Sequence, residues 1–100
     1  MNTDGWVLVN AAIADCLKGD PSYNDDFTIQ LKNKYGETVT KEVLSILAFT
    51  LNIPPNWENE SFDSFLRRSE KLINENYSNL NLPSVDKLIN QLAYHWMFAI

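Results

Sequence analysis

Residues 61–77, SFDSFLRRSEKLINENY, decide the fold class of this chain. Apolar residues recur in this stretch at the i, i+3, i+4 and i+7 spacing that places side chains on one face of an α-helix. Ser61 can cap the first turn, and Asp63 suits the positive N-terminal end of a helix. The predicted buried face comprises Phe62, Phe65, Leu66, Ser69, Leu72, Ile73 and Tyr77. A helix with one apolar face needs partners, so the fold should be built from packed helices.

The preceding stretch, residues 39–52, is apolar on more than one side. Val43 and Leu44 are neighbours in sequence, so they lie on different sides of a helix, and both are apolar. We therefore predict that this is the central and most buried helix. Pro54 and Pro55 end it, because proline lacks a backbone N–H and disfavours helical geometry in the residue before it.

The sequence also predicts a helix at each end of the chain. The first starts behind Asn2 or Thr3 and stops at Gly19, a residue type typical of helix C-termini. The last begins behind Pro83, with Ser84 as its cap, and runs to the chain end. The core residues predicted for these two helices are Trp6, Val9, Ile13, Cys16, Leu17, Val85, Leu88, Ile89, Leu92 and Trp96.

Residues 27–35 fit two structures. Phe27, Ile29 and Leu31 alternate with polar residues as in a half-buried strand, yet Phe27, Leu31 and Tyr35 also fit a helix that ends at Gly36. We expect a helix, because a lone strand needs a partner strand and none is evident nearby. A small β-hairpin around residues 27–43 is the alternative. The chain is thus predicted to be all-α, a compact bundle of four to five helices in a single domain covering residues 1–100.

The composition indicates a compact cytoplasmic protein. The chain has 100 residues, 45% of them hydrophobic, which suits one packed core. Cys16 is the only cysteine, so no disulfide can form within the chain, and the N-terminus lacks the basic-then-apolar order of a secretory signal. No apolar run approaches the roughly 18 residues needed to span a bilayer.

The inventory of catalytic and metal-binding groups is poor. His95 is the only histidine, which excludes a two-histidine metal site within one chain. Cys16 and His95 could form a nucleophile and base, but Cys16 lies on the apolar side of its predicted helix, where a thiol usually packs as a small hydrophobe. Asp25 and Asp26 suit helix caps better than an acid–base pair. We therefore expect no enzyme activity, no metal and no cofactor.

The negative charge of the chain is concentrated in two blocks. Residues 1–26 carry five aspartates against one lysine, and residues 58–63 carry three carboxylates and no cation. Residues 27–57 and 64–100 each have a net charge of +1, which completes the total of −5. Clustered carboxylates attract basic surfaces and repel nucleic acid and anionic lipid. A basic protein is therefore the expected partner, and nucleic acid and membranes are not.

Trp57 lies between Pro55 and the second acidic block. It can fold back as a lid on the core or stand out as an interface anchor, since tryptophan and tyrosine are common binding hot spots. The residues expected to bind a partner are Asp15, Asp20, Tyr23, Asp25, Asp26, Trp57, Glu58, Glu60 and Asp63. The alternative is that these acidic residues have no specific partner and only keep the protein soluble.

A small, acidic, helical chain without catalytic groups resembles the immunity proteins that bacteria make against their own nuclease toxins, including bacteriocin immunity proteins and those of contact-dependent growth inhibition systems. The resemblance covers size, charge and helical character over the whole chain, and no family motif aligns with it. It implies that carboxylates mimic phosphates and steer association with a basic toxin, whose active or substrate-binding surface is then masked. A monomer is expected.

Two alternatives share parts of this pattern. One is a phage or regulatory inhibitor that mimics nucleic acid and binds a host DNA- or RNA-binding protein. The other is a helical adaptor that dimerises through Tyr94 and Phe98, two aromatics beside the predicted core row of the last helix.

Overall fold

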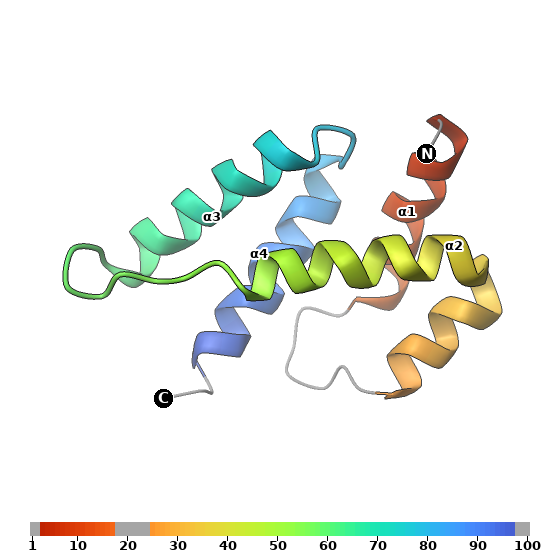
Figure 1. Ribbon diagram of the computed structural model, residues 1–100, viewed down its shortest axis with the longest axis horizontal. Helices are drawn as coiled ribbons and strands as arrows, with labels where there is room; N and C mark the ends of the chain where they lie inside the picture. The colour runs from red at the N-terminus through yellow and green to blue at the C-terminus, as the bar shows by residue number, and fades with distance from the viewer. Residues whose placement is uncertain (1–2, 18–24, 98–100) are drawn as a thin grey trace.

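The computed structural model describes residues 3–17 and 25–97, which form four α-helices (Figure 1). They are α1 (Thr3–Cys16), α2 (Asp25–Leu51), α3 (Phe62–Asn76) and α4 (Leu82–Met97). The all-α prediction is confirmed. The described residues contain no strand, and the alternative β-hairpin around residues 27–43 is wrong because that segment lies within α2. None of the described helices is long and apolar enough to cross a bilayer.

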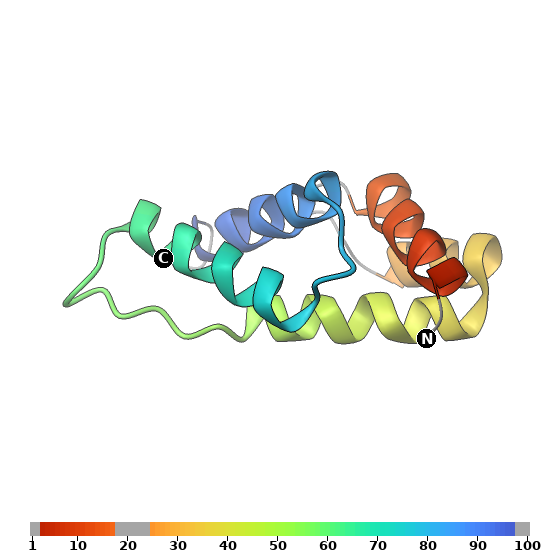
Figure 2. The same cartoon turned by 90° about the horizontal axis from the view of Figure 1, so that it is seen from above.

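α4 is the helix that packs against each of the other three, and α1 packs along α2 (Figures 1 and 2). In the structure α4 has the central position, whereas from the sequence the central helix was predicted to be residues 39–52. That segment does bury one face, but its other face, with Lys41 and Ser45, is exposed. The radius of gyration is 13.5 Å, close to the ~13 Å expected of a compact chain of this length.

Gly36 divides α2 into two helical segments. Its φ of 83° and ψ of 174° lie in a region that is essentially restricted to glycine. The hydroxyl of Thr40 donates to the Gly36 carbonyl oxygen at 2.7 Å, one turn into the second segment. The bend turns the first segment back along α1, so Phe27 and Leu31 reach the core. The predicted helix end at Gly36 is confirmed.

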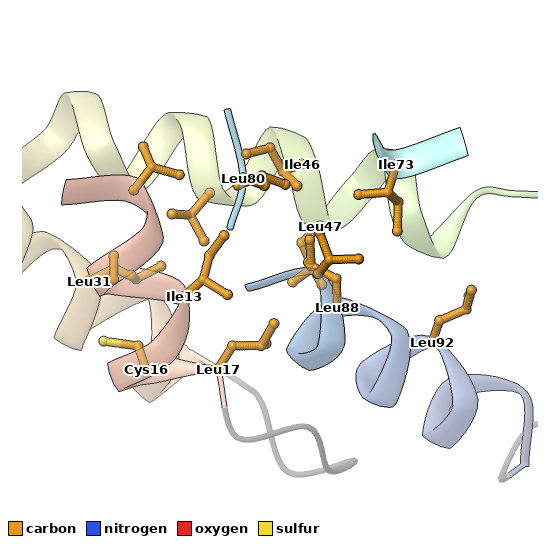
Figure 3. Close-up of a cluster of buried hydrophobic side chains, with 14 of the residues drawn as sticks. Ile13, Cys16, Leu17, Leu31, Ile46, Leu47, Ile73, Leu80, Leu88 and Leu92 are labelled. Carbon is orange, nitrogen blue, oxygen red and sulfur yellow. The ribbon is translucent and has the colours of Figure 1, made fainter. Parts of the chain in front are cut away.

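The core collects side chains from all four helices (Figure 3). Ile13, Leu31, Ile46, Ile73 and Leu88 are each completely buried. Most of the residues predicted for the core of the first and last helices are buried, namely Val9, Ile13, Cys16, Leu17, Val85, Leu88 and Leu92. The remaining three are half-buried against the core, namely Trp6, Ile89 and Trp96.

The predicted cap of α3 is confirmed. The Ser61 hydroxyl accepts the backbone N–H of Ser64 at 3.1 Å, and Asp63 lies in the first turn. α1 ends at Cys16, before the predicted last turn with Lys18 and the predicted stop at Gly19, both of which lie outside the described residues.

The predicted cap of α4 is wrong. The helix begins at Leu82, and the Asn81 side-chain oxygen accepts the Ser84 N–H at 3.0 Å. Ser84 is buried inside the first turn, where its hydroxyl donates to the Asn10 carbonyl of α1 at 3.4 Å. The side-chain oxygen of Asn10 in turn accepts the N–H of Asn81 at 2.8 Å. A contact between distant parts of the chain therefore sets where α4 starts.

Candidate protein-binding site

Residues 52–61 connect α2 to α3 at one end of the long axis of the molecule (Figure 1). We call this segment the Trp57 loop. Its tip is a turn in which the N–H groups of Asn59 and Glu60 both donate to the Asn56 carbonyl at 3.0 Å. The loop thus has a defined backbone although it contains no regular helix.

Arg68 of α3 holds the Trp57 loop in place. Its guanidinium donates to both carboxylate oxygens of Glu60, at 2.8 and 3.1 Å, and to the Pro54 carbonyl at 2.7 Å. The same guanidinium lies 5.5 Å from the centre of the Phe65 ring. These hydrogen bonds lower the pKa of Glu60, whose side chain is only 13% exposed. Glu60, predicted to bind a partner, has a structural role inside the loop.

Trp57 packs on the core, as one of the two predictions expected, and it also reaches the surface. Its ring stacks on Phe62 at 6.2 Å with an interplanar angle of 17°. It also meets Phe65 at 5.3 Å and Trp96 at 6.1 Å in edge-to-face contacts. The residue nevertheless remains 44% exposed. Three ring contacts therefore fix an aromatic side chain whose remaining surface is open to a partner.

Two carboxylates beside Trp57 are exposed. Glu58 follows it in sequence, and Asp63 follows Phe62, on which Trp57 stacks. Among the described residues, neither forms an ion pair, and Arg67, one turn after Asp63, does not reach it. Glu58 in the Trp57 loop and Asp63 in the first turn of α3 are therefore negative charges that no cation of the described residues pairs with.

The first acidic block is placed only in part. Asp15 accepts hydrogen bonds from Lys34 Nζ at 3.2 Å and from the Tyr35 hydroxyl at 3.1 Å, which joins α1 to the first segment of α2. Both contacts lower the pKa of Asp15. Asp20 and Tyr23 lie outside the described residues, as do the side chains of Asp25 and Asp26. α1 lies in the half of the molecule away from the Trp57 loop (Figure 1), and Asp15 at its C-terminal end contacts Lys34 and Tyr35 of α2.

The two ion pairs predict how stability depends on pH. Because the folded-state pKa values of Asp15 and Glu60 are lowered, their contribution is present above the unfolded pKa values of about 3.9 and 4.3 and is lost as pH falls through the folded values. The double variant Asp15→Asn/Glu60→Gln should unfold at lower urea concentration than the wild type at about pH 7, and the gap should close toward about pH 3.

The control for this experiment is Glu37→Gln/Asp86→Asn, which removes two exposed carboxylates that form no ion pair with any described residue. The control should follow the wild-type profile. A gap between Asp15→Asn/Glu60→Gln and the wild type that stays constant with pH would contradict the assignment.

Cys16 and His95 do not form a catalytic pair in the described structure. Cys16 is 4% exposed among core side chains at the end of α1 (Figure 3), and burial together with the charge of Asp15 raises the pKa of its thiol. His95 is exposed in the last turn of α4, with its ring 5.4 Å from Trp96. The described residues also contain no group of three or more His, Cys, Asp or Glu side chains arranged to hold a metal ion.

One exposed surface was missed in the sequence. The outer face of α1 carries no charged residue between Asp4 and Asp15, and it exposes Val7 (62%) and Leu8 (46%). We call Val7, Leu8, Ala11 and Ala14, all exposed, the α1 apolar face. The sequence did contain a signal for this surface, because α1 is apolar on all sides. Such a pattern is typical of a helix that is covered on every side.

An open groove of about 570 Å³ also lies between the end of α2 and the end of α3. Phe49 and Tyr77 meet in it edge to face at 5.4 Å. Asn52 and Asn76 line it as well, and their amide groups donate to carbonyls of their own helices, Ala48 and Leu72, at 2.7 and 2.8 Å. No periodicity in the sequence could indicate this groove, because it depends on how the two helices diverge.

The structure thus offers a fixed, half-open tryptophan, two exposed carboxylates near it in sequence that pair with no cation of the described residues, and a separate apolar helix face. The first includes Trp57, Glu58 and Asp63 from the predicted set, whereas Asp15 and Glu60 are held by cations of the chain itself. No protein-family model, curated protein or solved structure matches the chain.

Proposed function

We propose that the protein is a small acidic immunity protein that binds a basic toxin, of the nuclease type, and masks its active or substrate-binding surface. The observation that carries the proposal is the exposed Trp57, fixed on three aromatic rings, with Glu58 next to it in sequence and Asp63 next to its ring partner Phe62 as exposed carboxylates. In this proposal the protein acts in the cytoplasm as a monomer and needs no cofactor.

Binding would proceed in two stages. The net charge of −5 attracts a basic protein from a distance, which raises the association rate most at low salt. After contact, Trp57 is covered by the partner, and the complex dissociates slowly because a buried tryptophan is a typical hot spot. Since three rings already hold Trp57, little side-chain entropy is lost on binding.

The test co-expresses the open reading frames next to this gene and asks whether the immobilised chain captures a basic protein from them. Charge reversal in Glu58→Lys/Asp63→Lys should slow association about tenfold at low salt, because steering depends on charges near the contact. Trp57→Ala should instead speed dissociation by about 30-fold or more, the effect of losing a hot spot of about 2 kcal/mol.

The matched control is Glu37→Lys/Asp86→Lys, which changes the net charge equally at exposed positions in α2 and α4, outside the loop. It should retain most of the wild-type association rate. Equal slowing by both double variants would contradict a local site at the Trp57 loop. Capture of a nucleic-acid-binding protein that is not a toxin would move the proposal to the nucleic-acid-mimicking inhibitor.

A second candidate function is self-association through the α1 apolar face. Tyr94 is half-buried and Phe98 lies outside the described residues, so α1 is the better-supported surface for a dimer. A two-fold axis that runs two α1 helices antiparallel would cover the exposed Val7 and Leu8 of each copy with the same face of the other.

Sedimentation over a range of concentrations tests the second candidate. If the α1 apolar face mediates self-association, the wild type shows a rising average mass with concentration, and Leu8→Lys remains a monomer because it places a charge in the middle of the face. Ile29→Lys, at an apolar residue of α2 that is also exposed (54%), should behave as the wild type. A wild type that is monomeric at every concentration would rule out this dimer.

A further inference from the structure

The aromatic cluster under the Trp57 loop already binds one arginine of the chain itself. The Arg68 guanidinium lies 5.5 Å from the centre of the Phe65 ring and donates two hydrogen bonds to the Glu60 carboxylate. Ring and carboxylate thus act on the same cation, the first through cation–π attraction and the second through a charge-assisted, bidentate pair. This arrangement shows that an aromatic ring together with a carboxylate binds an arginine side chain in this protein.

Trp57 repeats the combination toward solvent. Its ring belongs to the same cluster through Phe65 and remains 44% exposed. Glu58, its sequence neighbour, and Asp63, the sequence neighbour of Phe62 on which Trp57 stacks, are exposed carboxylates. Within the described part of the chain, no cation lies over the Trp57 ring, and neither carboxylate forms an ion pair.

We infer that the Trp57 loop is a receptor for an arginine side chain of the partner, which lies on the exposed part of the Trp57 ring and pairs with Glu58 or Asp63. The inference rests on the proposed function, since it names the group of the basic partner that this surface binds. Arginine fits better than lysine because its planar guanidinium stacks on a ring while donating in a fork to a carboxylate. Tryptophan is also the aromatic residue that attracts cations most strongly.

The receptor is formed before the partner arrives. Phe62, Phe65 and Trp96 fix the ring, and Arg68 fixes the loop through Glu60 and Pro54. Glu60 is consequently occupied, which leaves two carboxylates for the incoming cation. A fixed ring with two unpaired acids close to it in sequence suits one side chain, in contrast to a broad acidic surface that any basic peptide would bind.

The probe is N-acetyl triarginine amide, and the comparison peptide is N-acetyl trilysine amide, which carries the same charge. The chain has three tryptophans, so nitrogen–proton spectra give three indole signals, and Trp57→Phe assigns one of them. Triarginine should move the Trp57 signal and bind about threefold or more tightly than trilysine. Glu58→Gln/Asp63→Asn should weaken triarginine binding about fivefold or more, and the charge-matched Glu37→Gln/Asp86→Asn less than about twofold.

Three results would overturn the inference: equal affinity for the two peptides, triarginine binding without movement of the Trp57 signal, or equal weakening by the two double variants. The spectra of the variants also report whether each remains folded. The proposed function fails by a different result, namely a basic partner that associates with Glu58→Lys/Asp63→Lys as fast as with the wild type. The peptide titration is independent of that partner, so the two failures are distinguishable.

Discussion

Replacement of Gly36 by alanine should lower the free energy of unfolding by about 1–3 kcal/mol, the cost of holding an L-residue in a region open almost only to glycine. The residue has φ 83° and ψ 174°. A Cβ added there would meet no atom within 4 Å, so the loss comes from the backbone and not from a clash. The alternative for the variant is a straight α2, which would carry Phe27 and Leu31 away from α1 and the core.

Thermal and urea unfolding followed by circular dichroism measure this change. The control is a synthetic chain with D-alanine at position 36, because a D-residue at these angles has the mirror-image geometry of an L-residue in the extended region. The D-alanine protein should be at least as stable as the wild type. If L-alanine at position 36 left stability unchanged, the bend would not depend on glycine.

Replacement of Asn10 by alanine should cost about 2–4 kcal/mol, since three hydrogen bonds of about 0.5–1.5 kcal/mol each are lost. The Asn10 amide donates to the carbonyls of Trp6 and Asn79 at 2.9 and 3.0 Å, and its oxygen accepts the Asn81 N–H at 2.8 Å. One side chain therefore links α1 to the turn that precedes α4. In a chain of this size, the midpoint of thermal unfolding should fall by roughly 10–25 °C.

Asn90→Ala is the matched control, because Asn90 is an exposed asparagine within α4. Alanine is the better helix former, so this variant should be as stable as the wild type or slightly more so. An Asn10→Ala protein that melts together with Asn90→Ala would show that the link between α1 and the turn contributes little.

The helices were predictable from sequence where one signal dominated. The apolar spacing of residues 61–77 and the cap at Ser61 determine α3 locally, and Gly36 marks the bend because no other residue type tolerates its geometry. The start of α4 was not predictable in the same way. Asn81 and Ser84 are both good caps, and the choice between them depends on Asn10, far away in sequence.

The candidate site was predictable only as a collection of acids. In sequence, Glu60 and Asp15 look like Glu58 and Asp63, yet the fold brings Arg68 to the first and Lys34 to the second. Which carboxylates stay available thus depends on cations that only the tertiary structure supplies. Trp57 was predicted either to pack or to stand out, and the structure shows that ring contacts with Phe62, Phe65 and Trp96 allow both.

The unequal packing of the helices has a consequence for local unfolding. α3 packs chiefly on α4, whereas α4 also packs on α1 and α2, so α3 can detach at a lower free energy than the rest. The rings that hold Trp57 belong to both of these helices, with Phe62 and Phe65 on α3 and Trp96 on α4. Each such opening would take the receptor apart while the other helices stay folded. A bound partner would therefore slow amide hydrogen exchange throughout α3, including residues that it never touches.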